Sequence, residues 1–398
     1  MINYKVGNYK KFTQRSKYKI IVIGLGDFIT FQYCLAFINY GYKVHYFNIE
    51  KEKTIKSHYY RKFVEGIELL KPDFIFTVNF TGFDLEGSLG AMLNLLGIRH
   101  FVYLTAHPLI ERESLEKNIY QTTQIMVPDK SWIKYLENSF NHPPIYLPIA
   151  LNEDIFFYKI GVEKNRDIVY HGYTNLDKLK SLEAINTLNN NINLLSAINK
   201  ISDNFLGGMN NLETMISNYE KKYGELIFPS KKDQKQFIEG IFLKADLKYK
   251  IETLTKLLKL KVEIFGDKNW ESVFKNYKYL RFKPSNHNSL ISLYNSSEIT
   301  ISVKNIFLPT SFNQVILEAP FFNSLVIPTA TEGLLEAFEN CNIPIVESLD
   351  DIYDKTKFFL KNRDQRESIL SNLKEEIFKN HRYINRVKSI DKFICENM

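Results

Sequence analysis

The chain has 398 residues, of which 44% are apolar and 14% aromatic, which is enough for two packed domains and excludes a disordered protein. The formal net charge of +7 is modest. The basic residues are scattered along the chain, which argues against the clustered basic face of a nucleic-acid-binding protein. Cys34, Cys341 and Cys395 show no metal or redox spacing, and their odd number argues against a disulfide framework.

The amino-terminal segment Met1–Lys19 is polar and basic and lacks the apolar stretch of a signal peptide. The sequence contains no run of 18 apolar residues, so no membrane-spanning helix is expected. Peripheral docking at a membrane surface stays open. With cysteines that suit a reducing compartment, the expected location is the cytoplasm.

A strand–helix–strand pattern opens the first half of the chain. Residues 18–23 form an apolar run that ends in Gly24-Leu-Gly-Asp27, and a helical pattern then continues to Gly41. Further strand patterns lie at residues 43–47, 74–78, 99–104 and 124–127. Continuous apolar runs are typical of parallel strands buried on both faces. Residues 1–150 are therefore predicted to form a Rossmann-like, doubly wound domain.

A second α/β series follows a crossing segment at residues 148–157. Its strand patterns lie at residues 167–170, 261–265, 280–282, 299–303, 325–327 and 343–346. Residues from about 175 to 258 are almost wholly helical in pattern, which predicts a helical insertion. The sequence thus predicts a second Rossmann-like domain over 151–380 and a final helix, 381–398, that packs back on the first domain. Ligands are expected in the cleft between the two halves, at the carboxyl ends of the strands.

The first glycine turn faces this expected cleft. It begins like a dinucleotide-binding fingerprint, but Ile29 stands where the third glycine belongs, which argues against a dehydrogenase. Gly24 and Gly26 suit either a tight turn or a loop that lets a substrate approach the backbone. Asp27 is a candidate acceptor-side base, and its alternative role is to cap the following helix.

His107 is the second candidate base. It lies in Thr105-Ala-His107-Pro108, directly after a predicted strand, where ligand-contacting loops are found. As a general base it would take a proton from an acceptor hydroxyl. The alternative is a histidine held in a turn by Pro108.

Two glycine turns in the second half of the chain suit the binding of a phosphate group. His171-Gly172 and Gly266-Asp267 each follow a predicted strand. The glycine allows close backbone approach, and the helix after His171-Gly172 offers free N–H groups. Such turns also use glycine for geometry alone.

The segment from Ser311 to Glu318 is the most informative stretch. A polar loop enters a helix, and the side chains of Ser311, Asn313 and Gln314 suit a diphosphate. Glu318 follows on a largely apolar helix, where ribose hydroxyls would be suitable partners for a buried carboxylate. The alternative is an exposed glutamate on the helix edge.

No metal signature occurs in the sequence. No Asp-x-Asp motif follows a predicted strand. The expected site therefore uses neither metal nor cofactor, and it would neutralise a leaving diphosphate with helix dipoles and side-chain donors.

The C-terminal half resembles the glycosyltransferases related to the spore-maturation protein CgeB, within the GT-B class. The matching segments are Tyr170-His-Gly172, Val262-Glu-Ile-Phe-Gly266 with Trp270, Leu293-Tyr294 with Ile299-Thr-Ile-Ser302, Asn313-Gln314 to Glu318, and His381-Arg-Tyr383-Ile-Asn-Arg386. The N-terminal half is similar more loosely, through Lys71-Pro-Asp73, Thr105 to Pro108, and Tyr146-Leu-Pro148. The resemblance implies two Rossmann-like domains facing a cleft, with nucleotide-sugar in the second and acceptor in the first. It also implies that Glu318 lies at the donor ribose.

Three positions depart from the family pattern. Val315 stands where the family often has an arginine, and Phe322-Asn-Ser324 replaces a usual glycine. Val326 falls where many retaining relatives have a second glutamate. The sequence therefore assigns neither retention nor inversion of the sugar configuration.

These patterns favour a metal-independent glycosyltransferase of the hexosyl or hexosaminyl class. Its expected partners are a nucleotide-sugar donor and a surface glycan or protein acceptor such as flagellin, and no nucleic acid. The first alternative is a nucleotide-sugar epimerase on the same fold. The second is a non-catalytic GT-B-like binding or scaffold protein, which Val315 and Val326 would favour.

Overall fold

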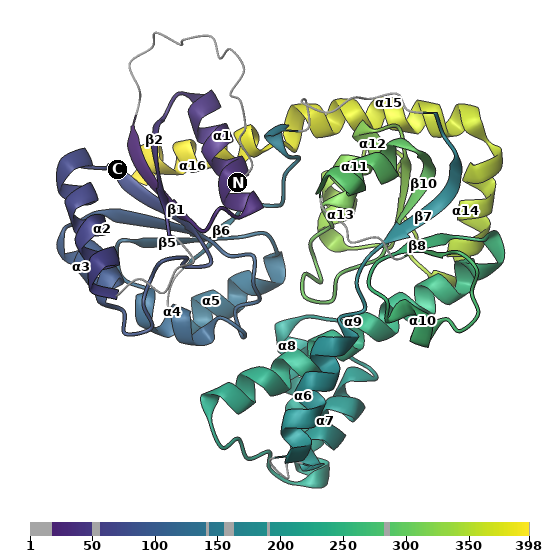
Figure 1. Cartoon of the computed structure of the whole chain (residues 1–398), viewed down its shortest axis with the longest axis horizontal. Coiled ribbons are helices and arrows are strands. Elements are labelled where there is room, and N and C mark those ends of the chain that lie inside the picture. The colour runs from purple at the N-terminus through teal and green to yellow at the C-terminus, as the bar shows by residue number, and fades with distance from the viewer. Residues whose placement is uncertain are drawn as a thin grey trace.

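The computed structural model describes residues 18–49, 56–140, 143–154, 163–188, 192–281 and 287–397. Most of the polar amino-terminal segment considered above lies outside these residues. The chain forms two α/β domains side by side, with a group of helices below and between them in the view of Figure 1. Among the described helices, none is both long and apolar enough to cross a membrane.

The N-terminal domain is built on a six-stranded parallel sheet. Its strands are β1 (Lys19–Gly24), β2 (Lys43–Asn48), β3 (Phe74–Val78), β4 (Arg99–Tyr103), β5 (Thr123–Val127) and β6 (Ile145–Tyr146), in the order β2-β1-β3-β4-β5-β6. Its helices are α1 (Phe28–Tyr40), α2 (Lys56–Leu70), α3 (Ser88–Leu95), α4 (Arg112–Asn118), the short η1 (Lys130–Trp132) and α5 (Ile133–Phe140). Strand β3 is buried at every residue, as expected for a parallel strand covered on both faces.

The C-terminal domain carries a five-stranded parallel sheet. Its strands are β7 (Arg166–His171), β8 (Glu263–Phe265), β9 (Leu280–Arg281), β10 (Ser297–Ser302) and β11 (Leu325–Pro328), in the order β11-β10-β7-β8-β9. Its helices are α10 (Trp270–Val273), α11 (His287–Asn295), α12 (Val315–Phe321), α13 (Glu332–Ala337), the short η4 (Leu349–Asp351) and α14 (Ile352–Lys361). Two parallel sheets flanked by helices confirm the predicted α/β class.

The strand expected at residues 343–346 does not form. Only Val346 pairs with the sheet, through an isolated bridge to Thr329. Pro344 lies within this run and has no backbone N–H to contribute to a ladder, which explains why an apolar pattern failed to become a strand.

The helical insertion follows β7 directly. It contains α6 (Leu176–Leu188), α7 (Ile192–Ser202), α8 (Met209–Tyr223), α9 (Lys231–Leu257) and the short η3 (Leu258–Leu260). Its apolar side shares one core with the N-terminal domain, in which Phe237 and Phe242 of α9 join Trp132 and Leu136. The insertion therefore packs against both domains, and Figure 1 shows α9 running back toward the second sheet.

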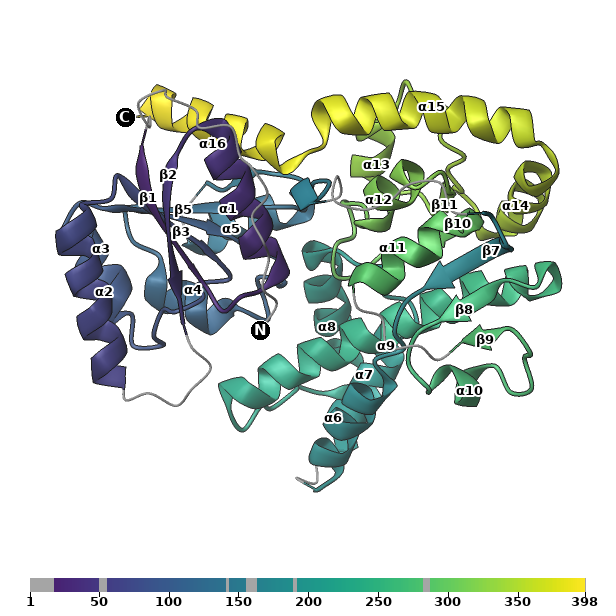
Figure 2. The ribbon, with the colours of Figure 1, turned by 45° about the horizontal axis from the view of Figure 1, so that its top comes forward.

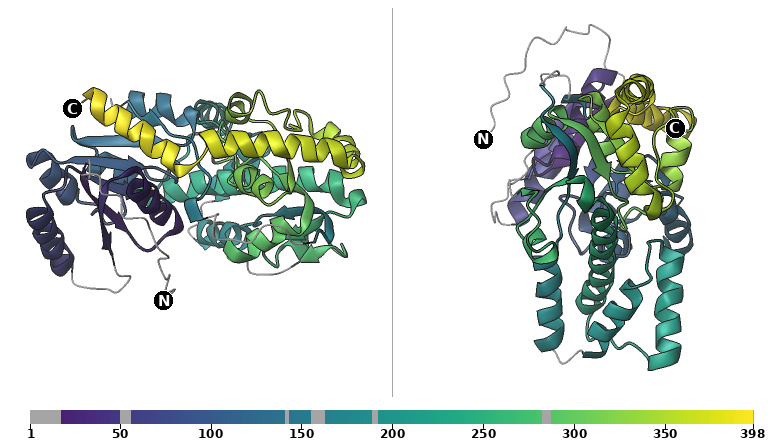
Figure 3. Two further views of the ribbon diagram at one scale, coloured as in Figure 1. Left: turned by 90° about the horizontal axis from the view of Figure 1, so that it is seen from above. Right: turned by 90° about the vertical axis from the view of Figure 1, so that its right-hand side faces the viewer.

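Two helices at the end of the chain connect the domains from the other side. Helix α15 (Arg363–Asn380) lies over the C-terminal domain and α16 (Tyr383–Asn397) over the N-terminal domain, as Figures 2 and 3 show. Helix α16 packs its apolar face on α1, and the hydroxyl of Tyr42 donates to Asp391 at 2.6 Å. Arg386 donates to the carbonyl oxygens of Pro148 at 2.6 Å and Ile149 at 2.8 Å, which ties this helix to the interdomain crossing.

Candidate functional site

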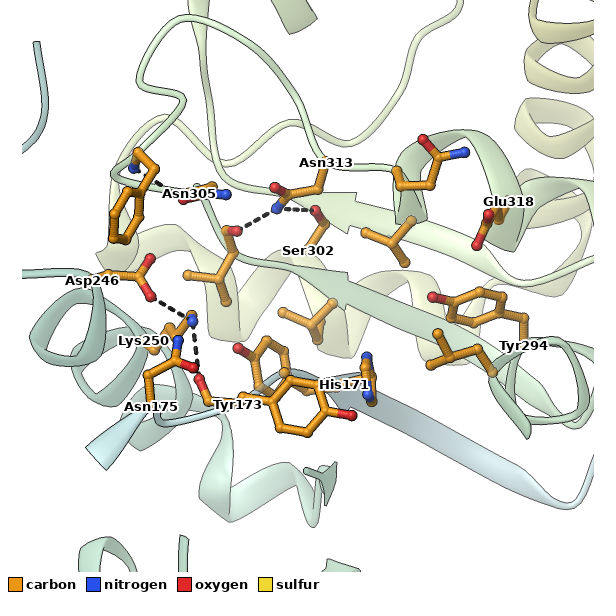
Figure 4. A pocket seen from close by; sticks show the side chains of 18 of the residues that line it. His171, Tyr173, Asn175, Asp246, Lys250, Tyr294, Ser302, Asn305, Asn313 and Glu318 are labelled. Carbon is orange, nitrogen blue, oxygen red and sulfur yellow. Dashed lines mark hydrogen bonds and ion pairs between the residues drawn. The ribbon is translucent and has the colours of Figure 1, made fainter. Parts of the chain in front are cut away.

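A pocket of about 470 Å³ opens at the carboxyl ends of β7 and β10. The strand order makes this the switch point of the second sheet, because the chain leaves β7 toward β8 on one side and later returns to β10 on the other. Open parallel sheets bind ligands at such points, and the volume is in the range of small-molecule sites. Phe28 of the N-terminal domain also lines the pocket, so the pocket faces the first domain. Figure 4 shows it from close by.

His171, at the end of β7, lines the middle of the pocket (Figure 4). Burial, together with the nearby charge of Lys250, lowers the pKa of this imidazole to about 4. The ring is therefore neutral at physiological pH. Its Nε2 atom is buried without a hydrogen-bond partner among the described residues.

The glycines predicted beside the donor are required by contacts within the protein. A Cβ atom on Gly172 would lie 2.2 Å from the hydroxyl oxygen of Tyr170, and one on Gly266 would lie 2.1 Å from the carbonyl oxygen of Gly172. Asp267 accepts hydrogen bonds from the backbone N–H and the hydroxyl of Thr174, at 2.6 and 2.7 Å. Gly172 lines the pocket, whereas Gly266 and Asp267 do not and instead contact the turn after β7.

Asn313 and Gln314 line the pocket, but their amide groups are already engaged. Asn313 donates to the carbonyl oxygen of Val303 at 2.6 Å and to the hydroxyl of Ser302 at 3.3 Å. Gln314 donates to the carbonyl oxygen of Ala150 at 2.8 Å and to the side-chain oxygen of Asn152 at 3.2 Å. Both side chains therefore order the loop before α12 instead of presenting free donors to a diphosphate.

Ser311 lies beside this loop and not on the pocket surface. Its side chain is buried, and its backbone N–H donates to the carboxylate of Asp129 at 2.9 Å. Asp129 follows β5 in the N-terminal domain, so this bond joins the two domains. Ser311 is thus part of a domain contact.

Glu318 lines one end of the pocket and is only 3% exposed. It accepts a hydrogen bond from the side-chain amide of Asn152. Burial raises the pKa of Glu318 to about 8, an effect that the amides of Gln314 and Asn152 partly offset. The carboxyl is therefore mostly protonated at pH 7. The alternative of an exposed glutamate on a helix edge is wrong.

An ion pair that the sequence analysis missed lies at the other end of the pocket. Asp246 and Lys250 of α9 both line the pocket, with 2.5 Å between their charged atoms. The Lys250 ammonium also donates to the carbonyl oxygen of Tyr173 at 3.1 Å. The sequence offered only their spacing of four residues within a polar helix, which is common on helix surfaces.

The first glycine turn lies beside Phe28, on the N-terminal side of the pocket. Asp27 caps α1 by accepting the N–H of Thr30 at 2.9 Å. A Cβ on Gly24 would lie 2.8 Å from the hydroxyl of Tyr46, and Gly26 has a positive φ of 73° that favours glycine. The structure therefore gives all three residues a local role, next to a residue that lines the pocket.

His107 lies away from the pocket. It is 2% exposed and packs between Trp132 and Phe242, with ring centroids 5.4 and 4.5 Å away. Burial lowers the pKa of His107 to about 3, so the ring is neutral at physiological pH. The expectation of a general base is corrected here, because an imidazole enclosed between the N-terminal domain and the insertion does not reach an acceptor hydroxyl in the pocket.

Among the described residues, no group of three or more His, Cys, Asp or Glu side chains is arranged to hold a metal ion. The two carboxyl groups that line the pocket are each engaged within the protein. Asp246 pairs with Lys250, and Glu318 accepts from Asn152.

Comparisons with known proteins agree with this geometry. Residues 248–392 match the model of a family described as glycosyl transferase-like. Sucrose-phosphate synthase from Thermosynechococcus elongatus superposes with a TM-score of 0.56 at 10% identity, covering 95% of this chain and 98% of its own. A glycosyltransferase from Rickettsia africae gives 0.56 at 11% identity, covering 96% and 100%. T4 phage BGT, in complex with its UDP-glucose substrate, gives 0.50 at 12% identity, covering 94% and 98%. No curated protein matches the sequence.

The similarities extend over both domains of the solved structures. Since they cover nearly the whole chain, they confirm the predicted GT-B fold of two Rossmann-like domains. The matched stretch 248–392 begins within α9 and ends within α16, so it is the C-terminal domain that carries the glycosyl transferase-like sequence.

Proposed function

We propose that this chain is a glycosyltransferase that holds a nucleotide-sugar in the pocket at β7 and β10. The observation that carries the proposal is the position of Glu318, a buried carboxyl at the switch point of the second sheet. Burying a carboxyl group is costly, and hydrogen bonds from ribose hydroxyls would offset that cost. The glycosyl transferase-like sequence of the same domain supports this reading.

The reaction requires an acceptor hydroxyl on the N-terminal side of the pocket. The bond between the anomeric carbon and the diphosphate oxygen breaks, and a bond from that carbon to the acceptor oxygen forms. The nucleoside diphosphate leaves, and the hydroxyl proton passes to a base. Asp27, beside Phe28, remains the proposed acceptor of this proton, provided that its carboxylate leaves the helix cap or acts through its second oxygen.

We further propose that the transfer needs no metal and that the acceptor is a glycan or protein such as flagellin. Metal independence is supported by the two lining carboxyl groups, which lie at opposite ends of the pocket and so do not converge on one cation (Figure 4), while Asp246 pairs with Lys250. The acceptor class rests on the resemblance to CgeB-related glycosyltransferases alone. A cytoplasmic location is part of the same proposal.

A binding or scaffold protein on the same fold is the second candidate. It is favoured by Val315, which lines the pocket where relatives often have an arginine, and by Val326, which is fully buried in β11. A valine in the core of a strand supplies no hydrogen bond to a donor sugar. The epimerase alternative has no comparable observation in its favour.

The first experiment is a thermal-shift screen of the whole chain against UDP-, GDP-, CMP- and dTDP-sugars. Ligands that bind the native state raise Tm by mass action. We expect a shift with one nucleotide class, which is lost in Glu318→Ala. Sugar transfer that depends on an added acceptor would then separate a transferase from an epimerase. If no nucleotide shifts the Tm of well-folded protein, the scaffold candidate replaces the enzyme.

A further inference from the structure

Among the described helices of the insertion, α9 is the one that lines the donor pocket, and it does so with an ion pair. Asp246 and Lys250 lie one turn apart on α9 and are 5% and 14% exposed. Both line the pocket, although the rest of the insertion packs on other surfaces. A buried ion pair is weak evidence for stability, because desolvation offsets most of the attraction between the charges. Its position on a ligand pocket therefore calls for a functional reading.

Lys250 is also the only lysine or arginine among the described residues that line the pocket. Val315, where the related glycosyltransferases often have an arginine, lines the same pocket. The side chains expected to bind a diphosphate at the start of α12 instead donate hydrogen bonds within the protein, as Asn313 does to the carbonyl oxygen of Val303. Negative charge in this pocket would thus have one cationic partner, and α9 supplies it.

The pocket has two chemically different ends. Figure 4 places Lys250 with Asp246 and Asn175 at one end, and Glu318 with Tyr294 at the other. His171 lies between them. A nucleotide has the same asymmetry, since its ribose carries hydroxyl donors and its phosphates carry the charge.

We propose that Lys250 binds the diphosphate of the nucleotide-sugar, so that the nucleotide lies with its ribose at Glu318 and its phosphates toward α9. The proposal rests on the proposed function and makes the insertion part of the donor site. An ammonium group has three donors, of which Asp246 and the carbonyl oxygen of Tyr173 use two. The third is the one that would bind a phosphate oxygen.

Asp246 has the opposite effect on such a ligand. Its negative charge pairs with Lys250, so it reduces the field that a diphosphate experiences. Its Oδ1 atom also accepts the N–H of Ile306 at 3.5 Å. Asparagine keeps an oxygen for that bond and removes the charge. Asp246→Asn should therefore strengthen diphosphate binding, whereas Lys250→Gln should weaken it.

The test measures Kd by calorimetry for UDP, GDP, CDP and dTDP and for the matching free nucleosides. For the nucleotide that binds, we expect Lys250→Gln to weaken the diphosphate by about tenfold or more, the loss typical of a charged hydrogen bond. The free nucleoside should bind as before. Lys250→Arg should retain most of the affinity, and Asp246→Asn should increase it.

Lys248→Gln is the matched control, because Lys248 lies on the same helix and donates to the carbonyl oxygen of Asp203 on the exposed surface. It should bind every ligand like the wild type. If Lys250→Gln weakens nucleoside and diphosphate equally, or weakens neither, the proposal for Lys250 is wrong while the donor site stands. If the wild type binds none of these nucleotides, the proposed function itself is overturned.

Discussion

The side-chain amide of Asn152 donates a hydrogen bond to the carboxyl of Glu318, so the segment that crosses between the domains contacts a residue that lines the pocket. The two residues are 1% and 3% exposed. Glu153, the next residue of this segment, accepts a hydrogen bond from Arg382 at 2.5 Å. A ligand that binds Glu318 would therefore contact a side chain that is itself hydrogen-bonded to the segment between the domains.

Glu318→Gln should stabilise the protein above pH 6. The folded state keeps Glu318 protonated up to a pKa of about 8, while the unfolded chain ionises near 4.5. The contribution of Glu318 to the free energy of unfolding is therefore largest below pH 4.5. It falls by about 1.4 kcal/mol per pH unit as the pH rises toward 8. Glutamine keeps an oxygen for Asn152 and does not ionise. Urea denaturation at pH 5 and pH 8 should show that the variant gains on the wild type as the pH rises between these two values.

The same pKa predicts that nucleoside binding strengthens with pH. Ribose hydroxyls donate to an ionised carboxylate, so below pH 8 binding must first remove the proton from Glu318. Affinity should rise by up to about tenfold per pH unit from pH 6 to pH 8 and then level off. Calorimetry with the free nucleoside avoids the ionisation of phosphate groups. Glu318→Gln should bind more weakly and show a flat profile, whereas a wild-type affinity that falls with pH would contradict the role given to Glu318.

The architecture was predictable from the sequence because its signals are local. The apolar run before Gly24 and the one before Gly172 each mark a buried strand and the turn after it, and the position of such turns indicates which edge carries the site. Glu318 was found in the same way, as a carboxyl on an apolar helix. The apolar run at 343–346 wrongly predicted a strand, because Pro344 has no backbone N–H for sheet pairing and this outweighs the apolar composition.

The contacts between distant segments were not predictable. Lys250 is one of many lysines in a polar helical stretch, and only the packing of α9 brings it to the carbonyl oxygen of Tyr173 and to the pocket. His107 follows a strand in the expected way, but Phe242 of the insertion covers it. Neither fact has a signal in the spacing of nearby residues, because both depend on where a long insertion folds back.

Asp129→Ala should destabilise the contact between the domains. The buried carboxylate of Asp129 accepts from the backbone N–H groups of Thr310 and Ser311, each at 2.9 Å, and from Ser131 in its own domain. Removing it leaves several buried donors without an acceptor, at about 1–3 kcal/mol each. We expect a loss of about 3 kcal/mol or more in urea denaturation. Asp350→Ala, which removes an exposed carboxylate paired with Lys256, should leave the unfolding midpoint unchanged.

His107→Leu should reduce the acid sensitivity of the protein while leaving sugar transfer intact. The pKa of His107 is lowered to about 3 by burial, so the folded state keeps the ring neutral while the unfolded chain takes up a proton below 6.5. The contribution of His107 to the free energy of unfolding is therefore largest above pH 6.5. It falls by about 1.4 kcal/mol per pH unit as the pH drops toward 3. Leucine fills a similar volume between Trp132 and Phe242 and takes up no proton.

Two measurements on His107→Leu decide between a core residue and a base. In urea denaturation, the variant should gain about 3 kcal/mol on the wild type between pH 6.5 and pH 4.5, two units of the loss just described. Its kcat should stay within a few-fold of the wild type at pH 7.5, because the imidazole lies outside the pocket. A general base contributes about a hundredfold or more to the rate. A loss of that size in kcat, with unchanged stability, would therefore require the insertion to move away from His107 during the reaction.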